Sequence, residues 1–459
     1  MDKTTEKFAA YAASLSYADL TPEAVHATKR CVIDAIGCAF GAFNAEPVKA
    51  VRALASQVSA TRPATLIGTQ IKSSPELAGF VNGTMIRYLD FSDDYFGGNG
   101  MQAGPHPSDN MGSLLAITES VGGSGKALIL ATALTYEADA QLVDHLHLNV
   151  KGWDYPTMHS VATALGAGKV LGLTKEQLGN ALGLAVVPNI CLLQTRVGEL
   201  SNWKGMAGPN GSRGGLFAAQ LAKEGVSGTS QPFEGKNGFM KQLNSPFELG
   251  KLGGKGTPFK IEDTFFKYLP VMYSAALPIW VALELRNKVK IEDIESIVLY
   301  AYSFILTTDA YTAERWDPKT RETADHSGPY LIAAALVDGE ITEKTLTPQR
   351  FRDPTILGVA KKIRVEEDKK YSAEYPRTLH CRLEATLKSG KVVTADQINP
   401  KGHPANPMSD REIEDKFLKQ VSPLLPEKQS RSLLDSLWNL EKLDDLGKLF
   451  AMMVVQTRS

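Results

Sequence analysis

The chain has few cysteines, and none has the spacing of a metal or redox motif. The four are Cys31, Cys38, Cys191 and Cys381, with no CxxC or CxxH pair among the 459 residues. An iron–sulfur cluster needs several thiolates, so the sequence argues against one. Cys31 and Cys38 lie seven residues apart on an apolar helical face, which favours core packing over ligation.

A long apolar run and an excess of charge are also missing. No stretch of about 18 apolar residues is present, and the N-terminal residues 1–6 are polar, without a signal pattern. The 50 basic and 51 acidic residues nearly cancel, so no strong field attracts nucleic acid or an anionic membrane. We expect a cytoplasmic protein without nucleic-acid or membrane partners, either a small-molecule enzyme or a neutral scaffold.

The apolar residues that are present suffice for two cores. At 459 residues, 43% of them hydrophobic, the chain exceeds one ordinary domain. Helical spacing prevails up to about residue 265, beginning with a predicted cap at Thr21 and Pro22 in the first turn. From about 268, β-type runs occur at 291–300 and 379–393, the second with a Ser389-Gly390 turn. Helices resume after 410, and the C-terminal ones are expected to return to the first domain.

The predicted fold is therefore mainly α. We expect a large all-α helical domain, residues 1–265 with 408–459, and a smaller α+β domain, residues 266–407. Residues 160–187 are rich in glycine and alanine, which permits close helix packing. No strand precedes these glycines, so a dinucleotide-binding fingerprint is not indicated.

Residues 323–339 combine polar groups with an apolar run. Asp325, His326 and Ser327 precede Tyr330, and residues 331–337 are almost all apolar. Residues 327 and 330 share one helical face, so the segment could present several hydrogen-bonding groups to one site. The alternative is a helix N-cap by Asp325 or Ser327, with Pro329 in the first turn.

A carboxylate cluster ends a second helical segment. Asp90, Asp93 and Asp94 are followed by a glycine-rich loop that returns to His106. Neighbouring carboxylates shift one another's pKa and, with an imidazole, suit acid–base catalysis. A divalent-cation site and a solvated loop remain alternatives here.

Two further segments carry candidate groups. Tyr155 and His159 lie four residues apart, on one face of a helix; His159 could equally be a packing residue. Lys204 precedes a helix predicted from Ser212, and a lysine beside a helix N-terminus suits an anion.

Together these segments resemble the MmgE/PrpD family, the 2-methylcitrate dehydratase-like proteins. The similar blocks are Leu89-Asp90-Phe91 with His106-Pro107-Ser108, then Lys151-Gly152-Trp153-Asp154, then residues 323–339, and finally residues 400–409. They span about residues 20–420, in one order. The resemblance implies a helical domain with an α+β lid, a homodimer, and a lyase that acts on a small anionic carboxylate. Because the sequence has no thiolate cluster, no strand-linked glycine fingerprint and no three-ligand set, we expect neither a metal nor an organic cofactor.

The resemblance also implies site residues. It assigns catalytic roles to Asp90, His106, Lys204 and Lys267, to Tyr330 as a possible acid, and to Tyr155 or His159 as the base. Substrate contacts are expected from Asp94, Tyr273, His326 and Ser327. Relatives usually have histidine where Tyr155 stands. We expect Asp90, His106, Lys204, Lys267 and Tyr330 to converge on one pocket between the helical domain and the lid.

The same scaffold is associated with more than one reaction. Dehydration of 2-methylcitrate is the leading expectation, by proton abstraction next to a carboxylate. Decarboxylation of cis-aconitate and epimerisation of an iminodisuccinate share the carbanion step. A non-catalytic helical dimer that kept the fold is the alternative of another class.

Overall fold

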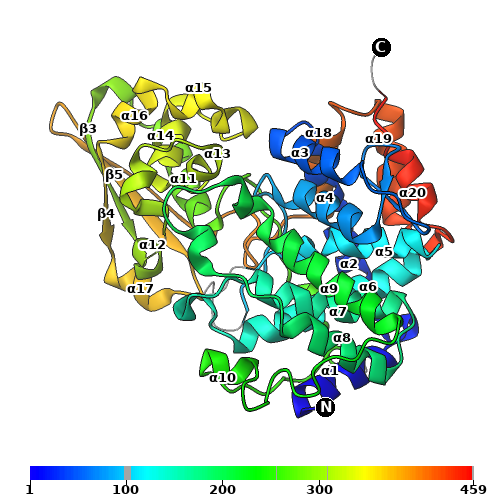
Figure 1. Cartoon of the computed structure of the whole chain (residues 1–459). Coiled ribbons are helices and arrows are strands. Elements are labelled where there is room, and N and C mark those ends of the chain that lie inside the picture. Colours follow the sequence, from blue (N-terminus) through cyan, green and yellow to red (C-terminus); the bar gives the residue numbers. More distant parts are fainter. Residues whose placement is uncertain (98–104, 255, 308, 457–459) are drawn as a thin grey trace. The chain divides into compact units, whose positions relative to one another are not determined.

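The computed structural model describes residues 1–97, 105–254, 256–307 and 309–456 (Figure 1). The chain divides into two compact units. Unit 1 comprises residues 1–194, 205–266 and 409–459, and unit 2 comprises residues 195–204 and 267–408. The assignment of residues 195–204 to unit 2 has no signal in the sequence. The predicted glycine-rich loop before His106 falls largely on residues 98–104, outside the described residues.

Unit 1 is helical, and the prediction of a mainly α fold is confirmed. Its α-helices are α1 Lys3–Ser14, α2 Pro22–Gly41, α3 Glu46–Ala55, α4 Pro75–Arg87, α5 Met111–Ser120, α6 Gly125–His145, α7 Pro156–Val170, α8 Lys175–Val186, α9 Ala207–Lys223, α10 Phe239–Leu243, α18 Asp410–Val421, α19 Glu427–Trp438 and α20 Gly447–Met452. Two short strands, β1 Ala64–Thr65 and β2 Lys72–Ser73, pair antiparallel. Thr21 caps α2 as predicted, accepting from the Ala24 N–H at 3.0 Å.

Small residues allow the central helices of unit 1 to approach closely. In α9, a Cβ on Gly215 would lie 2.2 Å from the Ser160 carbonyl oxygen of α7, and one on Gly211 would lie 2.3 Å from the Pro156 carbonyl oxygen. Helix α9 begins at Ala207, five residues before the predicted start, because Pro209 fits the first turn and the glycines are needed for this approach. Within 160–187, a Cβ on Gly166 would lie 2.0 Å from the Thr135 hydroxyl oxygen, so this small residue also serves packing within the chain. The homodimer stays a prediction.

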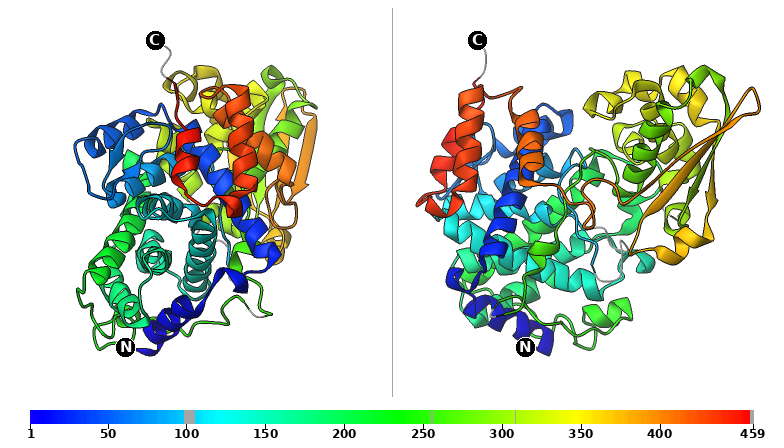
Figure 2. Two further views of the ribbon diagram at one scale, coloured as in Figure 1. Left: turned by 90° about the vertical axis from the view of Figure 1, so that its right-hand side faces the viewer. Right: turned by 180° about the vertical axis from the view of Figure 1, so that it is seen from behind.

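The C-terminal helices return to unit 1, where α18 packs on α2 (Figure 2). Lys416 of α18 pairs with Asp34 of α2 at 2.6 Å. Its ammonium also donates to the Phe91 carbonyl at 2.7 Å. Lys416 therefore fixes the backbone beside Asp90. Of the described helices, none is by itself both long and apolar enough to cross a membrane; only the bent pair α2 and α3, counted together, meets those criteria.

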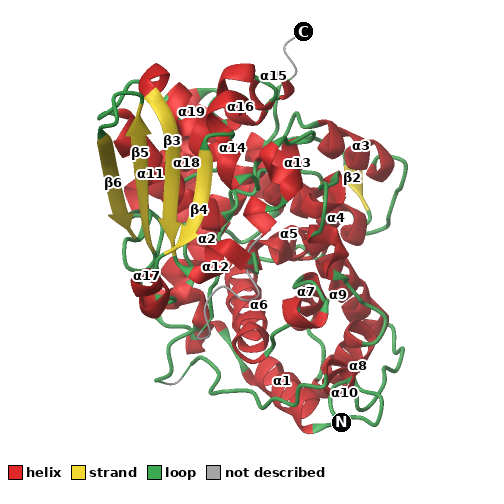
Figure 3. Cartoon of the chain, turned by 90° about the vertical axis from the view of Figure 1, so that its left-hand side faces the viewer, coloured by secondary structure: helices red, strands yellow, loops and turns green. Residues whose placement is uncertain are grey.

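Unit 2 is built on a four-stranded sheet with the order β4-β3-β5-β6 (Figure 3). The strands are β3 Ile294–Ala301, β4 Ile363–Glu367, β5 His380–Leu387 and β6 Val392–Ile398. β3 pairs parallel with β4 and antiparallel with β5. β5 and β6 form the predicted hairpin, whose turn contains Gly390 at φ 82°. Both β-type runs of the sequence are therefore strands.

Helices complete unit 2: α11 Tyr273–Arg286, α12 Ser303–Thr307, α13 Arg321–Ala324, α14 Gly328–Asp338, α15 Pro348–Phe351, α16 Pro354–Ala360 and α17 Lys369–Glu374. α11 packs on β5, β6 and α14. Residues 348–360 form two helices rather than one, because a residue before proline disfavours helical dihedrals and Asp353 precedes Pro354. Asp353 instead caps α16 through the Thr355 N–H at 2.8 Å.

Candidate active site

The polar cluster of unit 1 begins at the end of α4. Asp90 has a left-handed backbone, φ 53°, which a non-glycine residue adopts at a cost. This turn brings its carboxylate to Arg87, whose Nη1 lies 2.6 Å from Asp90 Oδ1, with both side chains buried. Burial lowers the pKa of Arg87, but Asp90, Tyr155 and Asp109 raise it to a net value above the ordinary one. Asp90 is thus a carboxylate held by a permanent cation.

His106 is held in one orientation beside Asp90. Its Nδ1 lies 2.7 Å from the Asp93 carbonyl oxygen. A carbonyl only accepts, so Nδ1 carries the proton and a neutral ring has its lone pair on Nε2. Nε2 lies 3.6 Å from Asp90 Oδ1. The structure therefore brings Asp90 and His106 together, as the sequence predicted.

Asp93 and Asp94 accept hydrogen bonds from backbone N–H groups on either side of His106. Asp93 is buried and accepts from the Ser108 N–H at 3.1 Å and the Tyr136 hydroxyl at 2.7 Å. Burial raises the pKa of Asp93 to about 7, although these two donors oppose the shift. Asp94 accepts from its neighbour's N–H, that of Tyr95, at 2.9 Å. The predicted substrate contact of Asp94 stays a prediction.

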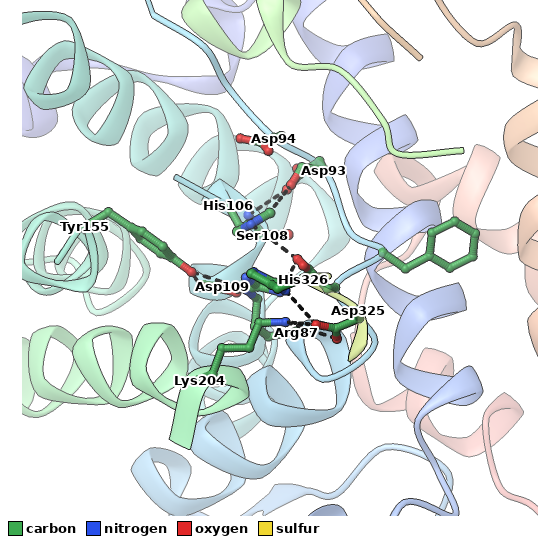
Figure 4. Close-up of polar contacts among 12 residues, drawn as sticks. Arg87, Asp93, Asp94, His106, Ser108, Asp109, Tyr155, Lys204, Asp325 and His326 are labelled. Carbon is green, nitrogen blue, oxygen red and sulfur yellow. Dashed lines mark hydrogen bonds and ion pairs between the residues drawn. The ribbon is translucent and has the colours of Figure 1, made fainter. Parts of the chain in front are cut away.

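Tyr155 lies in the centre of the unit 1 cluster, immediately before α7. Its hydroxyl accepts from Arg87 Nε at 3.2 Å and donates to Asp109 Oδ2 at 3.3 Å (Figure 4). Its ring meets those of His106 and His159 edge-on, with centroids 5.9 and 5.2 Å apart. Within this unit the cation beside the phenol is Arg87, a residue that the sequence had not singled out.

His159 is fully buried between two carboxylates. Its Nδ1 lies 2.9 Å from Asp139 Oδ2, and its Nε2 lies 3.5 Å from Asp109 Oδ2. Burial lowers the pKa of His159, but Asp139 and then Asp109 raise it to about 10. The ring is a stable imidazolium at neutral pH and has no lone pair for a substrate proton. This favours Tyr155 over His159 as the base.

The acidic groups of this cluster do not fit a metal ion. Asp90, Asp109 and Asp139 could each offer a carboxylate oxygen. Arg87 and His159 already lie at ion-pair distance from them, and a cation would have to displace these positive groups. The absence of a metal or other cofactor stays a prediction of the sequence.

A second cluster, in unit 2, is organised around Asp325, which is fully buried. Lys204 Nζ lies 2.9 Å from Oδ1 and 3.1 Å from Oδ2. Arg321 Nη1 lies 3.0 Å from Oδ2. His326 Nδ1 lies 2.6 Å from Oδ1 (Figure 4). Burial raises the pKa of Asp325, but Lys204, His326 and Arg321 together lower it below its ordinary value.

Lys267 and Tyr273 lie together in another part of unit 2. Both are buried and line a small hollow of about 10 Å³, which Lys401 also borders. The hollow holds at most a water molecule. The structure thus places the predicted Lys267 beside a second lysine and beside Tyr273, while their contacts with a substrate stay predictions.

Tyr330 and Ser327 have structural roles in unit 2. Ser327 is the N-cap of α14, accepting from the Tyr330 N–H at 3.1 Å, and its hydroxyl donates to the Arg315 carbonyl. The Tyr330 side chain is fully buried, and its hydroxyl donates to the Thr345 carbonyl at 2.6 Å. The cap alternative for this segment is confirmed. The catalytic role of Tyr330 stays a prediction that this hydrogen bond does not favour.

Sequence reasoning missed several members of the two clusters. Arg87 had a signal, because it lies three residues before Asp90 at the end of a helix. Asp109 lies next to the recognised His106 segment. Asp139, in the middle of α6, has no local signal, and neither does Arg321. The predicted catalytic residues are divided between the units, with Lys204, Lys267 and Tyr330 in unit 2, and their convergence on one pocket stays a prediction.

Comparison with known proteins adds independent information. The sequence pattern of the MmgE/PrpD N-terminal domain matches residues 6–251, and that of the MmgE/PrpD C-terminal domain matches residues 269–442. These two matches cover both units.

Characterised relatives have two different activities in their names. Cis-aconitate decarboxylase of Mus musculus is 25% identical, over 99% of this chain and 94% of that protein. The mitochondrial 2-methylcitrate dehydratase of Yarrowia lipolytica is 26% identical, over 90% and 82% respectively. 2-methylcitrate dehydratase of Cupriavidus necator is 24% identical, over 88% and 87%.

Proposed function

The chain belongs to the MmgE/PrpD family, and on this basis we propose that it is a lyase that removes a proton next to a carboxylate of a small di- or tricarboxylate. Dehydration of 2-methylcitrate or a close analogue is the leading reaction. The observation that carries the proposal is the Tyr155 hydroxyl, held between Arg87 and Asp109.

Tyr155 is the proposed base. A free phenol has a pKa near 10 and is a weak base at neutral pH. A cation that hydrogen-bonds to the phenol oxygen stabilises the phenolate, and Arg87 Nε does so at 3.2 Å. To act as a base, the phenol must first lose its own proton, and the proposed acceptor is Asp109 Oδ2, to which the hydroxyl donates a hydrogen bond at 3.3 Å.

Positive groups are required for the carboxylates of the substrate. Removing the proton places negative charge on the adjacent carboxylate, and fixed cations stabilise that enolate-like state. In unit 2, Lys204 and Arg321 share the single carboxylate of Asp325, which leaves a net positive charge on this group of residues. Lys267 is the further candidate cation.

Elimination also needs a proton for the departing hydroxide. His106 or, as the alternative, Tyr330 is the proposed donor. The Tyr330 hydroxyl already donates its proton in a hydrogen bond to the Thr345 carbonyl. These side chains would supply base, acid and positive charge, so the proposed reaction uses no metal or organic cofactor. We also propose a cytoplasmic homodimer, for which light scattering at micromolar concentration is the test.

Decarboxylation is the second candidate. It is favoured by the decarboxylase of Mus musculus, which aligns with nearly this whole chain. Both reactions pass through a carbanion next to a carboxylate, but decarboxylation releases CO₂ and dehydration releases water. Fold alone does not separate them.

The test incubates the protein with 2-methylcitrate, citrate and cis-aconitate in deuterated water. A lyase of this type incorporates deuterium next to a carboxylate; loss of water or of CO₂ identifies the reaction. Tyr155→Phe should abolish exchange, while Tyr17→Phe, a half-buried tyrosine with Lys126 over its ring, should not. A wild-type protein without exchange on any of these acids would support the non-catalytic scaffold instead.

A further inference from the structure

Unit 1 contains a cavity of about 920 Å³ whose lining shares no residue with the Tyr155 cluster. We call it the C-terminal cavity. Its lining comes from residues 65–72, from Glu119 at the end of α5, from the first turns of α19, and from residues 447–456, which include α20. Sites for small ligands usually have volumes of roughly 300–1,000 Å³, so the C-terminal cavity is large enough for one.

The walls of the C-terminal cavity are held in place by hydrogen bonds between distant segments. Gln429 Nε2 of α19 donates to the Met452 carbonyl at 2.8 Å and to the Val454 carbonyl at 3.1 Å. The Val455 N–H donates to the Gly68 carbonyl, between β1 and β2, at 2.9 Å. The chain after α20 is therefore tied both to α19 and to the β1–β2 hairpin, and the cavity is a defined feature of the fold.

One part of the lining is apolar. Phe450 is buried, and Met452 and Val454 are partly exposed. Covering these side chains with an apolar group removes apolar surface from water, which is favourable whatever the shape of that group. The apolar wall accordingly selects a ligand with an apolar body, and the charged residues of the lining decide what else the ligand carries.

Two lysines of the lining, Lys72 and Lys428, are exposed. Within the part of the chain that the structure describes, neither lysine has an ion-pair partner. Glu427, the neighbour of Lys428, is already paired with Arg431 at 2.9 Å. The ammonium of Lys428 is therefore available to an anion that enters the cavity.

Glu119 is the carboxylate of the lining. It accepts from the Thr65 N–H at 2.6 Å and from the Thr65 hydroxyl at 2.5 Å. Burial raises the pKa of Glu119, whereas the Thr65 hydrogen bonds and Lys72 oppose the shift, and Lys72 does so more strongly than Asp445 acts in the other direction. Lys72 thus offsets Glu119, and Lys428 is left as one surplus positive charge, which suits a ligand with one negative charge.

We propose that the C-terminal cavity binds a small amphipathic monocarboxylate, with its carboxylate at Lys428 and its apolar chain against Phe450, Met452 and Val454. This site goes beyond the proposed function and does not depend on it. Its ligand class also differs from the proposed substrates, which carry two or three carboxylates and no long apolar chain.

Octanoate is the probe, and methionine-methyl ¹³C NMR of the whole protein is the readout. Met452 lines the cavity, and its signal is assigned by its absence in Met452→Leu. We expect the Met452 signal to shift saturably with octanoate, and the affinity for acetate or for 1-octanol to be at least about 5-fold weaker, because each lacks one of the two interactions. The signal of Met158, three residues after Tyr155, should not shift.

Two variants test the charge and the space separately. Lys428→Gln should weaken octanoate binding about 5-fold or more, the size expected for one partly exposed ion pair. Ala451 is an exposed residue of the lining, so Ala451→Trp should fill the cavity and abolish binding. Lys448→Gln is the matched control, because Lys448 pairs with Asp444 on the surface of α20, outside the lining, and it should bind octanoate as wild type does.

Each contrary result overturns a stated part of the proposal. Equal affinity for octanoate and 1-octanol, or unchanged binding in Lys428→Gln, would refute the role of the carboxylate. A saturable shift of Met158 without one of Met452 would place octanoate in the Tyr155 cluster instead, and the absence of any saturable shift would refute the site. None of these results depends on turnover, so a failure of the proposed lyase activity is distinguished from a failure of this site.

Discussion

Arg87 and Tyr155 are joined by a hydrogen bond of 3.2 Å from the guanidinium Nε to the phenol oxygen. The two residues lie 68 positions apart, at the end of α4 and directly before α7. Arg87 also pairs with Asp90. One buried cation therefore contacts both the carboxylate of Asp90 and the proposed base, Tyr155. This relationship gives a physical reason why a tyrosine can act as the base at this position.

The first prediction concerns the choice of base. Tyr155→Phe should lower turnover on a confirmed substrate by at least about 100-fold, because the phenol oxygen is the proton acceptor. His159→Gln should keep more of the activity than Tyr155→Phe at equal folded concentration. Turnover per folded molecule, with unfolding monitored by circular dichroism, is the measurement. The opposite order would make His159 the base.

The second prediction is a pH dependence of stability from His159. Its pKa is about 10 in the folded protein and near 6.5 when unfolded. Because the folded value is raised, the stabilisation is fully present below pH 6.5 and is lost as the pH rises through 10. The size is on the order of 5 kcal/mol.

Urea unfolding at pH 6, 8 and 10 measures this dependence of stability on His159. His159→Gln should be less stable than wild type at pH 6, and the difference should narrow toward pH 10. A constant difference across this range would contradict the ionised state inferred for His159.

The third prediction is a pH dependence of stability from Asp93. As with His159, stability is lost as the pH rises, but at lower pH values. The pKa of Asp93 is about 7 in the folded protein, mainly through burial, against about 3.9 for a free carboxyl group. The contribution of Asp93 to folding stability is fully present below pH 4. It is lost as the pH rises through 7, because the folded state then holds a buried charge.

Asp93→Asn should remove the loss of stability that wild type shows as the pH rises through 7. Asparagine can still accept from the Ser108 N–H, and its amide can donate to the Tyr136 oxygen. Relative to wild type, the variant should gain stability between pH 5 and pH 8 in thermal unfolding. A variant that loses stability over this interval would show that Asp93 is ionised in the native state.

The fourth prediction concerns the C-terminal helix α18. Lys416→Met removes the cation that faces the buried carboxylate of Asp34, and an uncompensated buried charge costs about 3–5 kcal/mol. It also frees the Phe91 carbonyl, next to Asp90. We expect a large loss of stability in urea unfolding, together with lower activity at equal folded concentration.

Lys448→Met is the matched control for Lys416→Met. Lys448 pairs with Asp444 on an exposed surface, where such pairs contribute little. The stability of the Lys448→Met variant should match that of wild type. Equal effects of the two variants would mean that the Lys416–Asp34 pair contributes no more than a surface ion pair.

Much of the local structure was predictable. Thr21-Pro22 marks the start of α2, Ser327 caps α14, and the Ser389-Gly390 turn joins two strands, because caps and turns depend on residues next to one another. The start of α9 was not predicted. Its glycines resemble loop residues in sequence, and only their contact with α7 explains them.

The order of the motifs along the chain determined the family, and the pairing of Asp90 with His106 followed from a loop that returns. Only the tertiary structure decided which charges meet. Asp139 faces His159, Arg87 faces Tyr155, and the Tyr330 hydroxyl faces Thr345 rather than a substrate. Such pairings depend on helices packed from distant parts of the chain. Burial then sets the protonation of each group, because a low dielectric strengthens the interactions with the few neighbours that packing provides.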